Sequence, residues 1–345
     1  MTTYKISLMP GDGIGPEQTE ATIRVFERLK DAFGLDLQFI ETEAGDDCKR
    51  RHGSALPDDT IHTLETTDAC LKGPVGETSY DVIVTLRQMF DLYANLRPTR
   101  AYPGVKCLDP KTDMIIVREN TEDLYKGLEF EVADSAIAPR VTTTRACQRI
   151  AAKAFGIAEM RNKKRLVTAV HKANVLKRTC GLFAAVCREE ANQHPDVSFN
   201  EMYVDAAAMN LVRQPASFDV LVTTNMFGDI LSDEAAQVVG GLGLAPSGNI
   251  GEDFAIFEPV HGSGPDIAGK KIANPTSMLL SASMMLDWLG DRFGDPNYRA
   301  AARSLEIGVI QTLTHRITTP DLGGNCTTQQ VAEAVAERIP LRVVQ

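Results

Sequence analysis

The stretch YKISLMPGDGIGPEQTEATIRVFERLKDAFGLDLQFIE, residues 4–41, decides the fold class of this 345-residue chain. Residues 4–10 form a short apolar run that predicts a strand, and residues 16–34 space their apolar side chains as a helix does. Residues 35–41 predict a second strand. A strand, a helix and a strand in this order form the repeating unit of α/β proteins with a parallel sheet.

The same alternation continues along the rest of the chain. Further strands are predicted at 71–76, 113–120, 129–137, 165–173, 198–205 and 218–225. Helices are predicted at 81–98, where Pro98 should end the helix, and at 146–160, 174–192, 232–243, 276–289, 297–315 and 327–338. The pattern predicts an α/β fold with a largely parallel central sheet flanked by helices.

Composition excludes several classes of protein. The net charge of −10 argues against a nucleic-acid partner, although an acidic chain can still hold a basic pocket for a small anion. The N-terminal residues lack the apolar core of a signal peptide, and the longest apolar stretch, 277–290, is too short to span a membrane. Seven cysteines, an odd number without a C-x-x-C pair, indicate free thiols in a reducing cytoplasm.

Three aspartates follow predicted strands. Asp229 and Asp233 are four residues apart at the predicted start of a helix, so both project from one face, and Asp205 ends another predicted strand. Ligands bind at the carboxyl ends of parallel strands, and Mg²⁺ prefers carboxylate oxygens. The alternative is that acids in a first helical turn only complement the helix dipole. Three such acids favour a divalent-metal site.

A second group contains cationic side chains and a tyrosine. Arg87, Arg97 and Arg118 lie at or near predicted element ends, and each guanidinium can hold a carboxylate by two hydrogen bonds. Tyr125 and Lys172 are candidates for proton transfer, because a Lys at a strand end can act as a base if its pKa is lowered. Each of these residues could instead be an ordinary surface side chain.

Two glycine-rich segments could contact a cofactor. In the loop 257–275, His261 could meet a phosphate and Asp266 could accept hydrogen bonds from a ribose, as acids do in NAD sites. The alternative is a structural loop with a solvated Asp. The segment 10–17 lacks the third glycine of G-x-G-x-x-G, because Pro16 stands there. We therefore interpret it mainly as a tight turn near the cleft.

Together these motifs resemble the β-decarboxylating dehydrogenases, the family of isopropylmalate, isocitrate and homoisocitrate dehydrogenases. The resemblance covers nearly the whole chain, and archaeal-type isopropylmalate dehydrogenases share both DVIVTLRQ and RENTEDLYKG. It implies a two-domain fold, with an outer cofactor-side domain of residues 1–98 and 250–345 and an inner dimerisation domain of residues 99–249. The matching phrases are GDGIGPE, LRQMFDLYANLRP, VRENTEDLYKG, HKANVLK, YVDAAAMNLV, FGDILSDEAA, FEPVHGSGPDIAGKKIANP and TPDLGGNCTT.

The resemblance also implies roles for individual residues. Arg87, Arg97 and Arg118 would bind the carboxylates of a malate-type substrate. Tyr125 and Lys172 would transfer protons, and Asp205, Asp229 and Asp233 would bind Mg²⁺ or Mn²⁺. Lys172, Asp205 and Asn174 would come from the neighbouring subunit of a homodimer, or of a tetramer built from such dimers. The cofactor would lie along the loop that contains His261, Gly262, Asp266, Ile267 and Asn274.

The cofactor implied is NAD. NADP-using relatives have a Lys and a Tyr where this chain has Asp266 and Ile267. The Asp266 carboxylate would repel a 2′-phosphate and accept hydrogen bonds from the free ribose hydroxyls.

The substrate implied is 3-isopropylmalate, oxidised and decarboxylated to 4-methyl-2-oxopentanoate. Ile83 and Val84 fall on the helical face that also carries Arg87, and an apolar face suits an isopropyl group. They could instead only pack the helix against the core. Asn120 instead favours isocitrate or homoisocitrate as the substrate, because isocitrate and homoisocitrate enzymes share this residue. These two activities are the alternatives. A regulatory subunit without catalysis is a further alternative, which the filled catalytic positions disfavour.

Overall fold

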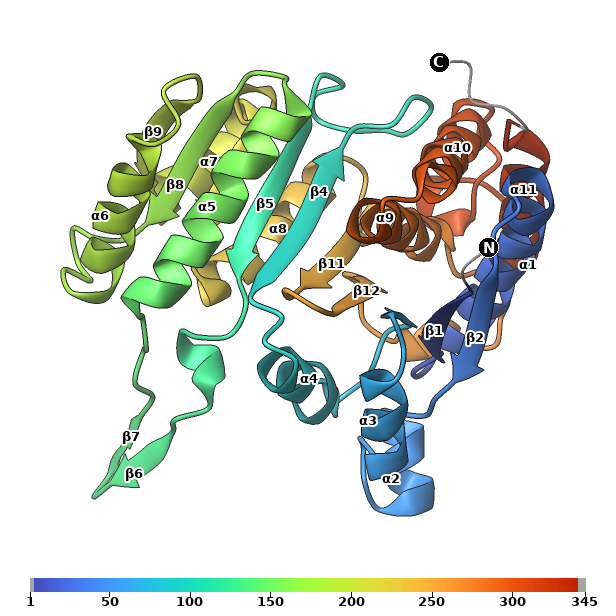
Figure 1. Cartoon of the computed structure of the whole chain (residues 1–345), viewed down its shortest axis with the longest axis horizontal. Helices are drawn as coiled ribbons and strands as arrows, with labels where there is room; N and C mark the ends of the chain where they lie inside the picture. Colours follow the sequence, from blue (N-terminus) through green and yellow to red (C-terminus); the bar gives the residue numbers. More distant parts are fainter. Residues whose placement is uncertain (1–2, 341–345) are drawn as a thin grey trace.

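The computed structural model describes residues 3–340, and its centre is a ten-stranded sheet (Figure 1). The strand order is β2-β1-β3-β12-β11-β4-β5-β10-β8-β9. Six of the nine pairings are parallel, so the predicted α/β fold with a largely parallel sheet is confirmed. The strands are β1 Tyr4–Met9, β2 Leu37–Glu41, β3 Ala69–Lys72, β4 Ala94–Arg100, β5 Asp113–Glu119, β8 Leu166–His171, β9 Ser198–Tyr203, β10 Val220–Thr223, β11 Pro246–Ile250 and β12 Ala255–Pro259.

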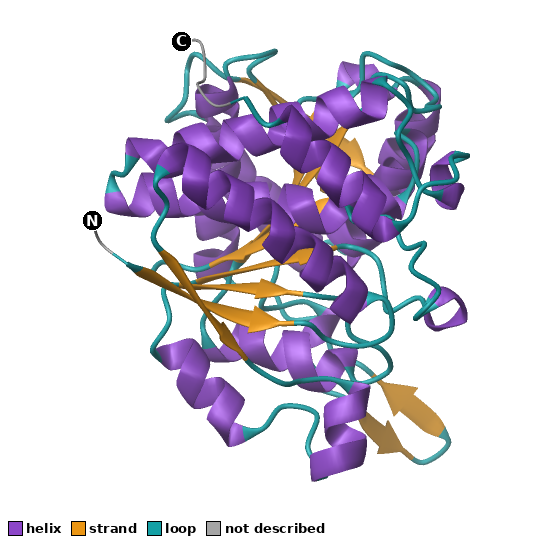
Figure 2. Ribbon diagram, turned by 90° about the vertical axis from the view of Figure 1, so that its right-hand side faces the viewer, coloured by secondary structure: helices purple, strands orange, loops and turns teal. Residues whose placement is uncertain are grey.

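Helices lie on both sides of the sheet (Figure 2). In Figure 1, α1 and α9 to α11 gather beside β1 and β2, and α5 to α8 surround β5, β8 and β10. No helix of residues 3–340 is both long and apolar enough to cross a bilayer. The helices are α1 Gly15–Phe33, α2 Asp46–His52, α3 Asp58–Glu65, α4 Thr85–Met89, α5 Thr144–Arg161, α6 Thr179–Ala191, α7 Val204–Arg213, α8 Asn225–Val238, α9 Thr276–Phe293, α10 Pro296–Thr314 and α11 Thr328–Arg338.

Strand β5 shows how the core positions the site. Its odd-numbered residues Ile115 and Val117 belong to the core cluster with α5, and its even-numbered Met114 and Ile116 pack with α7 and α8. Burial on both faces explains why this strand is a continuous apolar run. The even-numbered face continues to Arg118, so the alternation of the strand carries this arginine toward α8.

The centre of the sheet is antiparallel. Strand β4 pairs with β5 on one side and with β11 on the other, and β11 pairs with β12. Both boundaries of the two-domain division expected from the sequence, at 98/99 and at 249/250, fall within these neighbouring strands. The division itself stays a prediction.

The expectation of one helix over 81–98 is wrong. A π-helical turn at Tyr80–Val84 continues into the short α4, and residues 94–100 form strand β4. Pro98 therefore lies inside a strand. Strand β11 pairs only with residues 94–96, so the edge of β4 that faces β11 has no strand partner at Pro98. Proline is tolerated at such edges because it has no N–H to donate.

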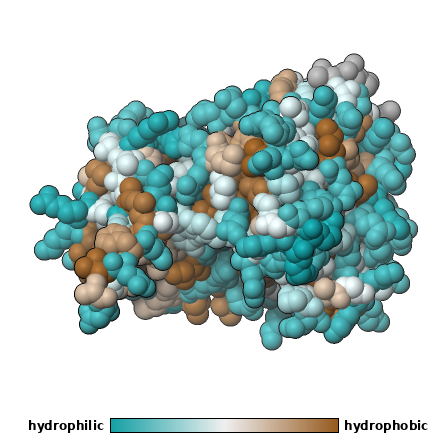
Figure 3. Space-filling view, turned by 90° about the horizontal axis from the view of Figure 1, so that it is seen from below, coloured by the Kyte–Doolittle hydropathy of each residue, from teal (hydrophilic) through white to brown (hydrophobic). Residues whose placement is uncertain are grey.

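Two further differences concern small elements. Residues 129–137 form not one strand but a hairpin of β6 Phe130–Val132 and β7 Ser135–Ile137, which projects from the half of the molecule that carries α5 to α8 (Figure 1). Its large apolar side chains are about half exposed, and Figure 3 shows hydrophobic patches on this half of the molecule. Helices α2 and α3 and strands β11 and β12 were not predicted from the sequence. All seven cysteines are free thiols, as predicted.

Candidate active site

The glycine-rich turn between β1 and α1 is tightly packed against neighbouring loops. Gly11 and Gly13 have positive φ angles, 72° and 58°, and a Cβ on either would lie 2.1 Å or less from a backbone oxygen of another loop. The Asp12 carboxylate between them accepts hydrogen bonds from the backbone N–H groups of Asp46, Asp47 and Gly76, at 2.9, 3.1 and 3.0 Å. The structure therefore confirms a tight turn that fastens three loops.

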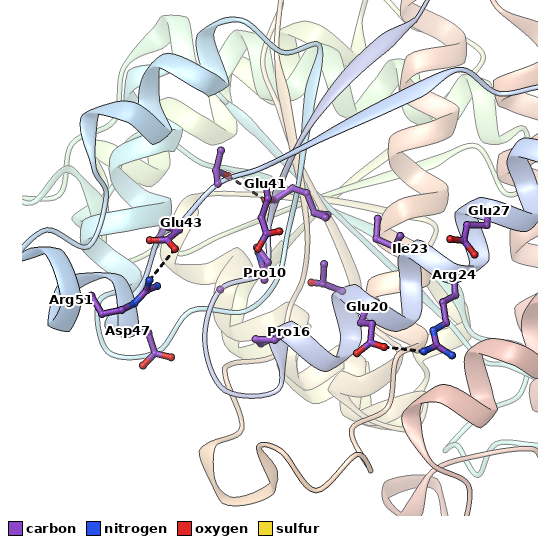
Figure 4. Close-up of a pocket in the computed structure, with 15 residues that line it drawn as sticks. Pro10, Pro16, Glu20, Ile23, Arg24, Glu27, Glu41, Glu43, Asp47 and Arg51 are labelled. Carbon is purple, nitrogen blue, oxygen red and sulfur yellow. Dashed lines mark hydrogen bonds and ion pairs between the residues drawn. The ribbon is translucent and has the colours of Figure 1, made fainter.

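A cavity of about 660 Å³ does not contain the predicted residues. It lies between α1 and the segment 41–51, and charged side chains surround it (Figure 4). Arg24 pairs with Glu20 at 3.0 Å and Arg51 with Glu43 at 3.0 Å, so both of its arginines already have carboxylate partners. The two arginines of this cavity are therefore not free to bind an anionic ligand.

A second cavity, of about 350 Å³, brings most of the predicted residues together. It holds four cationic side chains and three carboxylates, an excess of positive charge in a chain whose net charge is −10. A small anion is the ligand that such a lining favours. Among the sequence-predicted residues, the lining includes Ile83, Val84, Arg87, Arg97, Arg118, Tyr125, Asp229, Asp233, His261 and Gly262.

Arg118 and Asp229 form the centre of this cavity. Arg118 Nη1 lies 2.6 Å from Asp229 Oδ1, and the rest of its guanidinium donates to Asn225 on α8. A Cβ at Gly228 would lie 2.6 Å from Arg118 Cγ. A glycine at this position of α8 therefore leaves space for the Arg118 side chain to pack against the helix. Burial would raise the pKa of Asp229, but Arg118 and Arg97 outweigh it and lower this pKa to about 2.

Arg97 links the same carboxylate to the next turn of α8. Its Nη2 lies 3.1 Å from Asp229 Oδ1, its Nη1 lies 3.4 Å from Asp233 Oδ1, and Nη1 also donates to Ser232 Oγ at 2.6 Å. Helix α8 begins at Asn225, so Asp229 and Asp233 lie beyond its first turn. The dipole explanation for these acids is therefore wrong, because that effect falls off within the first turn.

Behind Arg87 lies a buried charge network that the sequence reasoning missed. Glu258 Oε2 accepts from Lys72 Nζ at 2.7 Å, and its Oε1 lies 3.3 Å from Arg87 Nη2. Asn249 Oδ1 accepts from Arg87 Nε at 2.9 Å. Burial would raise the pKa of Glu258, but Lys72 and Arg87 outweigh it and lower this pKa to about 2. Together these partners fix the orientation of the Arg87 guanidinium at the cavity.

Tyr125 reaches the cavity from a short 3-10 turn, Leu124–Lys126. Its hydroxyl donates to Asp229 Oδ2 at 2.5 Å, and the Arg118 guanidinium lies 5.1 Å from the centre of its ring. Burial and the hydrogen bond to Asp229 raise the pKa of Tyr125, so the phenol keeps its proton at neutral pH.

Six of the predicted residues lie outside this cavity: Lys172, Asn174 and Asp205, and three residues of the cofactor loop, Asp266, Ile267 and Asn274. Lys172 follows β8 and forms an ion pair with Asp205, which lies in the first turn of α7 and not at a strand end. The Asp205 side chain is 66% exposed, and Asn174 is also exposed. In residues 3–340 no three His, Cys, Asp or Glu side chains group closely enough to hold a metal ion. One chain thus brings together two of the three predicted metal ligands.

The predicted cofactor loop borders the cavity at His261 and Gly262. His261 Nε2 lies 3.1 Å from Gln18 Nε2, and Gln18 also donates to the carbonyl of Asn274 at 2.7 Å, so α1 holds both ends of the loop. Burial lowers the pKa of His261. Asp266 is exposed, and no side chain of the described residues forms an ion pair with it. Its neighbour Ile267 is half-buried.

One wall of the cavity is apolar. Val75, Ile83 and Val84 line it and are also packed in a core cluster, so the packing role of Ile83 and Val84 is observed and their contact with a substrate stays a prediction. Asn120 does not line the cavity. It is 2% exposed and donates to the Leu92 carbonyl at 2.9 Å and to Asn249 Oδ1 at 3.0 Å. Asn120 therefore supports, from outside the cavity, the network of Asn249 and Arg87.

Comparisons with known proteins agree with this arrangement. The sequence model of the isocitrate/isopropylmalate dehydrogenase family matches residues 5–335. A 3-isopropylmalate/3-methylmalate dehydrogenase of Methanocaldococcus jannaschii is 52% identical, over 97% of this chain and 99% of that protein. A 3-isopropylmalate dehydrogenase of Saccharolobus solfataricus is 51% identical, over 96% and 98%. The solved structure of an isocitrate dehydrogenase from Methylococcus capsulatus has a TM-score of 0.90 and 43% identity, over 98% of this chain and 99% of that one.

Proposed function

The chain belongs to the isocitrate/isopropylmalate dehydrogenase family, and we propose that it is an enzyme that oxidises and decarboxylates 3-isopropylmalate with NAD and a divalent cation. The products would be 4-methyl-2-oxopentanoate, CO₂ and NADH. The observation that carries this proposal is the cavity in which three buried arginines face two aspartates and an apolar wall.

The arginines support a dicarboxylate substrate. Arg87, Arg97 and Arg118 are each less than 10% exposed and line one cavity. Their present partners are carboxylates of the protein, which supports a role for these guanidinium groups in binding such ligands. A malate-type substrate would offer its own carboxylates to the same groups.

The apolar wall supports an isopropyl group over a third carboxylate. Val75, Ile83 and Val84 offer no donor to a charged arm, and burying a carboxylate without a partner is costly. Isocitrate and homoisocitrate each carry such an arm, so they remain the alternative substrates. The two relatives named for isopropylmalate also have higher identity, 52% and 51%, than the isocitrate dehydrogenase structure at 43%.

The acids of α8 fit half of a site for Mg²⁺ or Mn²⁺. Asp229 and Asp233 line the cavity with side chains 36% and 54% exposed, so their oxygens are accessible. Hard divalent cations take six or more oxygen ligands, and Mg²⁺ usually keeps several waters and substrate oxygens. In our proposal Asp205 of a second copy supplies the third carboxylate.

A homodimer would supply these missing residues. Val175 follows Lys172 by three residues, and Met209 and Val212 on α7 and Ile230 on α8 are all more than half exposed. Large apolar side chains exposed on adjoining elements mark interaction surfaces. They come from the same segments as Lys172, Asp205 and Asp229, which supports a site completed across the dimer.

The loop 261–274 fits NAD. The Asp266 carboxylate is exposed and free to accept ribose hydroxyls, and it would repel the 2′-phosphate of NADP. When bound, the cation would stabilise negative charge on the substrate oxygens, and NAD would accept the hydride from C2.

The chain itself would move the protons. Lys172 of the second copy would take the proton of the 2-hydroxyl as C2 is oxidised. The 2-oxo acid then carries a carboxylate β to the carbonyl, and loss of CO₂ leaves an enolate. The Tyr125 hydroxyl would deliver a proton to its carbon, in keeping with a phenol whose pKa is raised.

A substrate panel tests this proposal. The purified protein is given NAD and Mg²⁺ with 3-isopropylmalate, isocitrate, homoisocitrate or tartrate, and kcat/KM is compared. We expect the highest value for 3-isopropylmalate and loss of activity on chelation. A higher value for isocitrate or homoisocitrate would assign the chain to that alternative, and no NADH from any of them would indicate a ligand-binding subunit without catalysis.

A further inference from the structure

Asp123 has a strained backbone two residues before Tyr125. Its φ of 68° and ψ of −147° lie in a region that glycine adopts almost alone, and its side chain is 2% exposed. Such a conformation costs of order 1–3 kcal/mol and persists only where the surrounding contacts impose it. The contacts of Asp123 should therefore reveal what the strain maintains.

The Asp123 carboxylate joins the Tyr125 segment to the beginning of α8. Oδ1 accepts from the Leu124 N–H at 2.9 Å, and Oδ2 accepts from the Met226 N–H at 3.2 Å. Oδ2 also pairs with Arg140 Nη2 at 2.6 Å, and the same nitrogen donates to Thr224 Oγ1 at 2.6 Å. Thr224 is the N-cap residue of α8, so one buried ion pair fastens two segments that are 100 residues apart.

The same helix holds the acceptor of the tyrosine hydroxyl. Asp229 lies one turn beyond Met226 on α8, and its Oδ2 accepts from Tyr125 at 2.5 Å. The segment of Tyr125 is thus fixed to α8 through Asp123, through the Glu122 carbonyl, which accepts from Asn225 Nδ2 at 3.2 Å, and through the Tyr125 hydroxyl. Asp123 does not line the active-site cavity, so any effect on the reaction must pass through the residues that it holds.

We infer that Asp123, paired with Arg140, is a positioning residue that fixes the Tyr125 hydroxyl relative to the carboxylates of α8. The inference rests on the proposed function, in which Tyr125 delivers a proton after CO₂ is lost. A misplacement of about 1 Å can cost about a hundredfold in rate, so the loss of this ion pair should reduce turnover.

A double-mutant cycle separates positioning from general stability. Asp123→Asn keeps the shape and removes the charge, and we expect kcat to fall about tenfold or more while KM for 3-isopropylmalate stays within about twofold. In a Tyr125→Phe background the same change should alter kcat by less than about twofold, because the hydroxyl that it positions is already gone. An equal loss of kcat in both backgrounds would overturn the inference.

A matched control comes from Asp219, which is fully buried and pairs with Arg161 Nε at 3.0 Å in the same half of the molecule. Asp219→Asn removes a buried ion pair of the same kind away from the cavity. It should lower the melting temperature without changing kcat. If it reduced kcat as much as Asp123→Asn does, the effect would be one of stability and the inference would be wrong.

A spectroscopic measurement keeps this inference separate from the proposed function. The chain has seven tyrosines, and fluorotyrosine labelling gives each a ¹⁹F resonance, with that of Tyr125 assigned by its absence in Tyr125→Phe. We expect Asp123→Asn to shift or broaden this resonance and Asp219→Asn to leave it unchanged. An unchanged Tyr125 resonance in Asp123→Asn would overturn the inference. An inactive wild-type protein would overturn only the proposed function.

Discussion

Replacing Glu258 with Gln removes the carboxylate that joins Lys72 and Arg87 and changes almost nothing in volume. The Glu258 side chain is 10% exposed and that of Lys72 is 2% exposed, so water compensates poorly for the lost partner. The pKa of Glu258 falls from its ordinary value of 4.5 to about 2, which corresponds to about 3 kcal/mol of stability for the ionised form. Breaking one side of a buried ion pair typically costs about 3–5 kcal/mol, which agrees. We expect Glu258→Gln to be less stable by about 3 kcal/mol at pH 7.

Urea unfolding followed by tryptophan fluorescence measures this difference. Trp288 is the single tryptophan, and its ring lies 6.1 Å from that of Phe257, the neighbour of Glu258. Because the folded-state pKa of Glu258 is depressed, its contribution is complete above pH 4.5 and is lost as the pH falls toward 2. The difference between wild type and variant should therefore shrink by about 1 kcal/mol at pH 3.5.

The exposed ion pair of Glu306 with Arg100, at 2.7 Å, provides the control. Glu306→Gln should cost less than about 1 kcal/mol, because exposed pairs contribute little. The reasoning about the buried network is refuted if Glu258→Gln is as stable as Glu306→Gln at pH 7, or if its deficit does not change between pH 7 and pH 3.5.

Three further predictions concern ligands. The double change Asp266→Lys with Ile267→Tyr should move the cofactor preference from NAD toward NADP, measured as the ratio of kcat/KM for the two cofactors. A wild-type protein that uses both equally would contradict our assignment of NAD. Val84→Arg places a cation in the apolar wall, so kcat/KM should fall for 3-isopropylmalate and rise for homoisocitrate. A fall for both substrates would mean that the wall does not contact the substrate side chain. Gly228→Ala puts a Cβ 2.6 Å from Arg118 Cγ, and such overpacking costs about 1–3 kcal/mol. We expect a higher KM for 3-isopropylmalate and a lower melting temperature. An unchanged KM would show that Arg118 does not bind substrate.

The parts of the fold that follow from local pattern could be predicted. The unit of residues 4–41 and the apolar run of β5 have clear periodicity, because each buries its faces in a regular way. Strand β11 has no such signal. Its sequence PSGNI is small and polar, and a Cβ on Gly248 would lie 3.1 Å from Phe257 and 3.2 Å from Met284, so a larger side chain would be tightly packed there. Contacts with other elements create this strand, and they also override the helical pattern of residues 94–98.

The residues of the candidate site likewise differ in whether they could be predicted from the sequence. Arg97, Arg118, Asp229 and Asp233 could be identified because their residue types and element ends suggest anion and metal binding. The network of Lys72 and Glu258 could not, since 186 residues separate the partners and neither position has a local signal. The sequence positions of Lys172 and Asp205 do not indicate whether these residues complete the active site of their own chain or that of a second copy.

The most direct test of a shared active site is to mix two inactive variants. Lys172→Met and Asp229→Asn should each abolish NADH formation from 3-isopropylmalate. If Lys172 serves the neighbouring copy, a hybrid dimer has one intact site, and subunit exchange of equal amounts should restore about a quarter of wild-type activity. No recovery after verified exchange would contradict the account, because it would mean that Lys172 and Asp229 act within one chain.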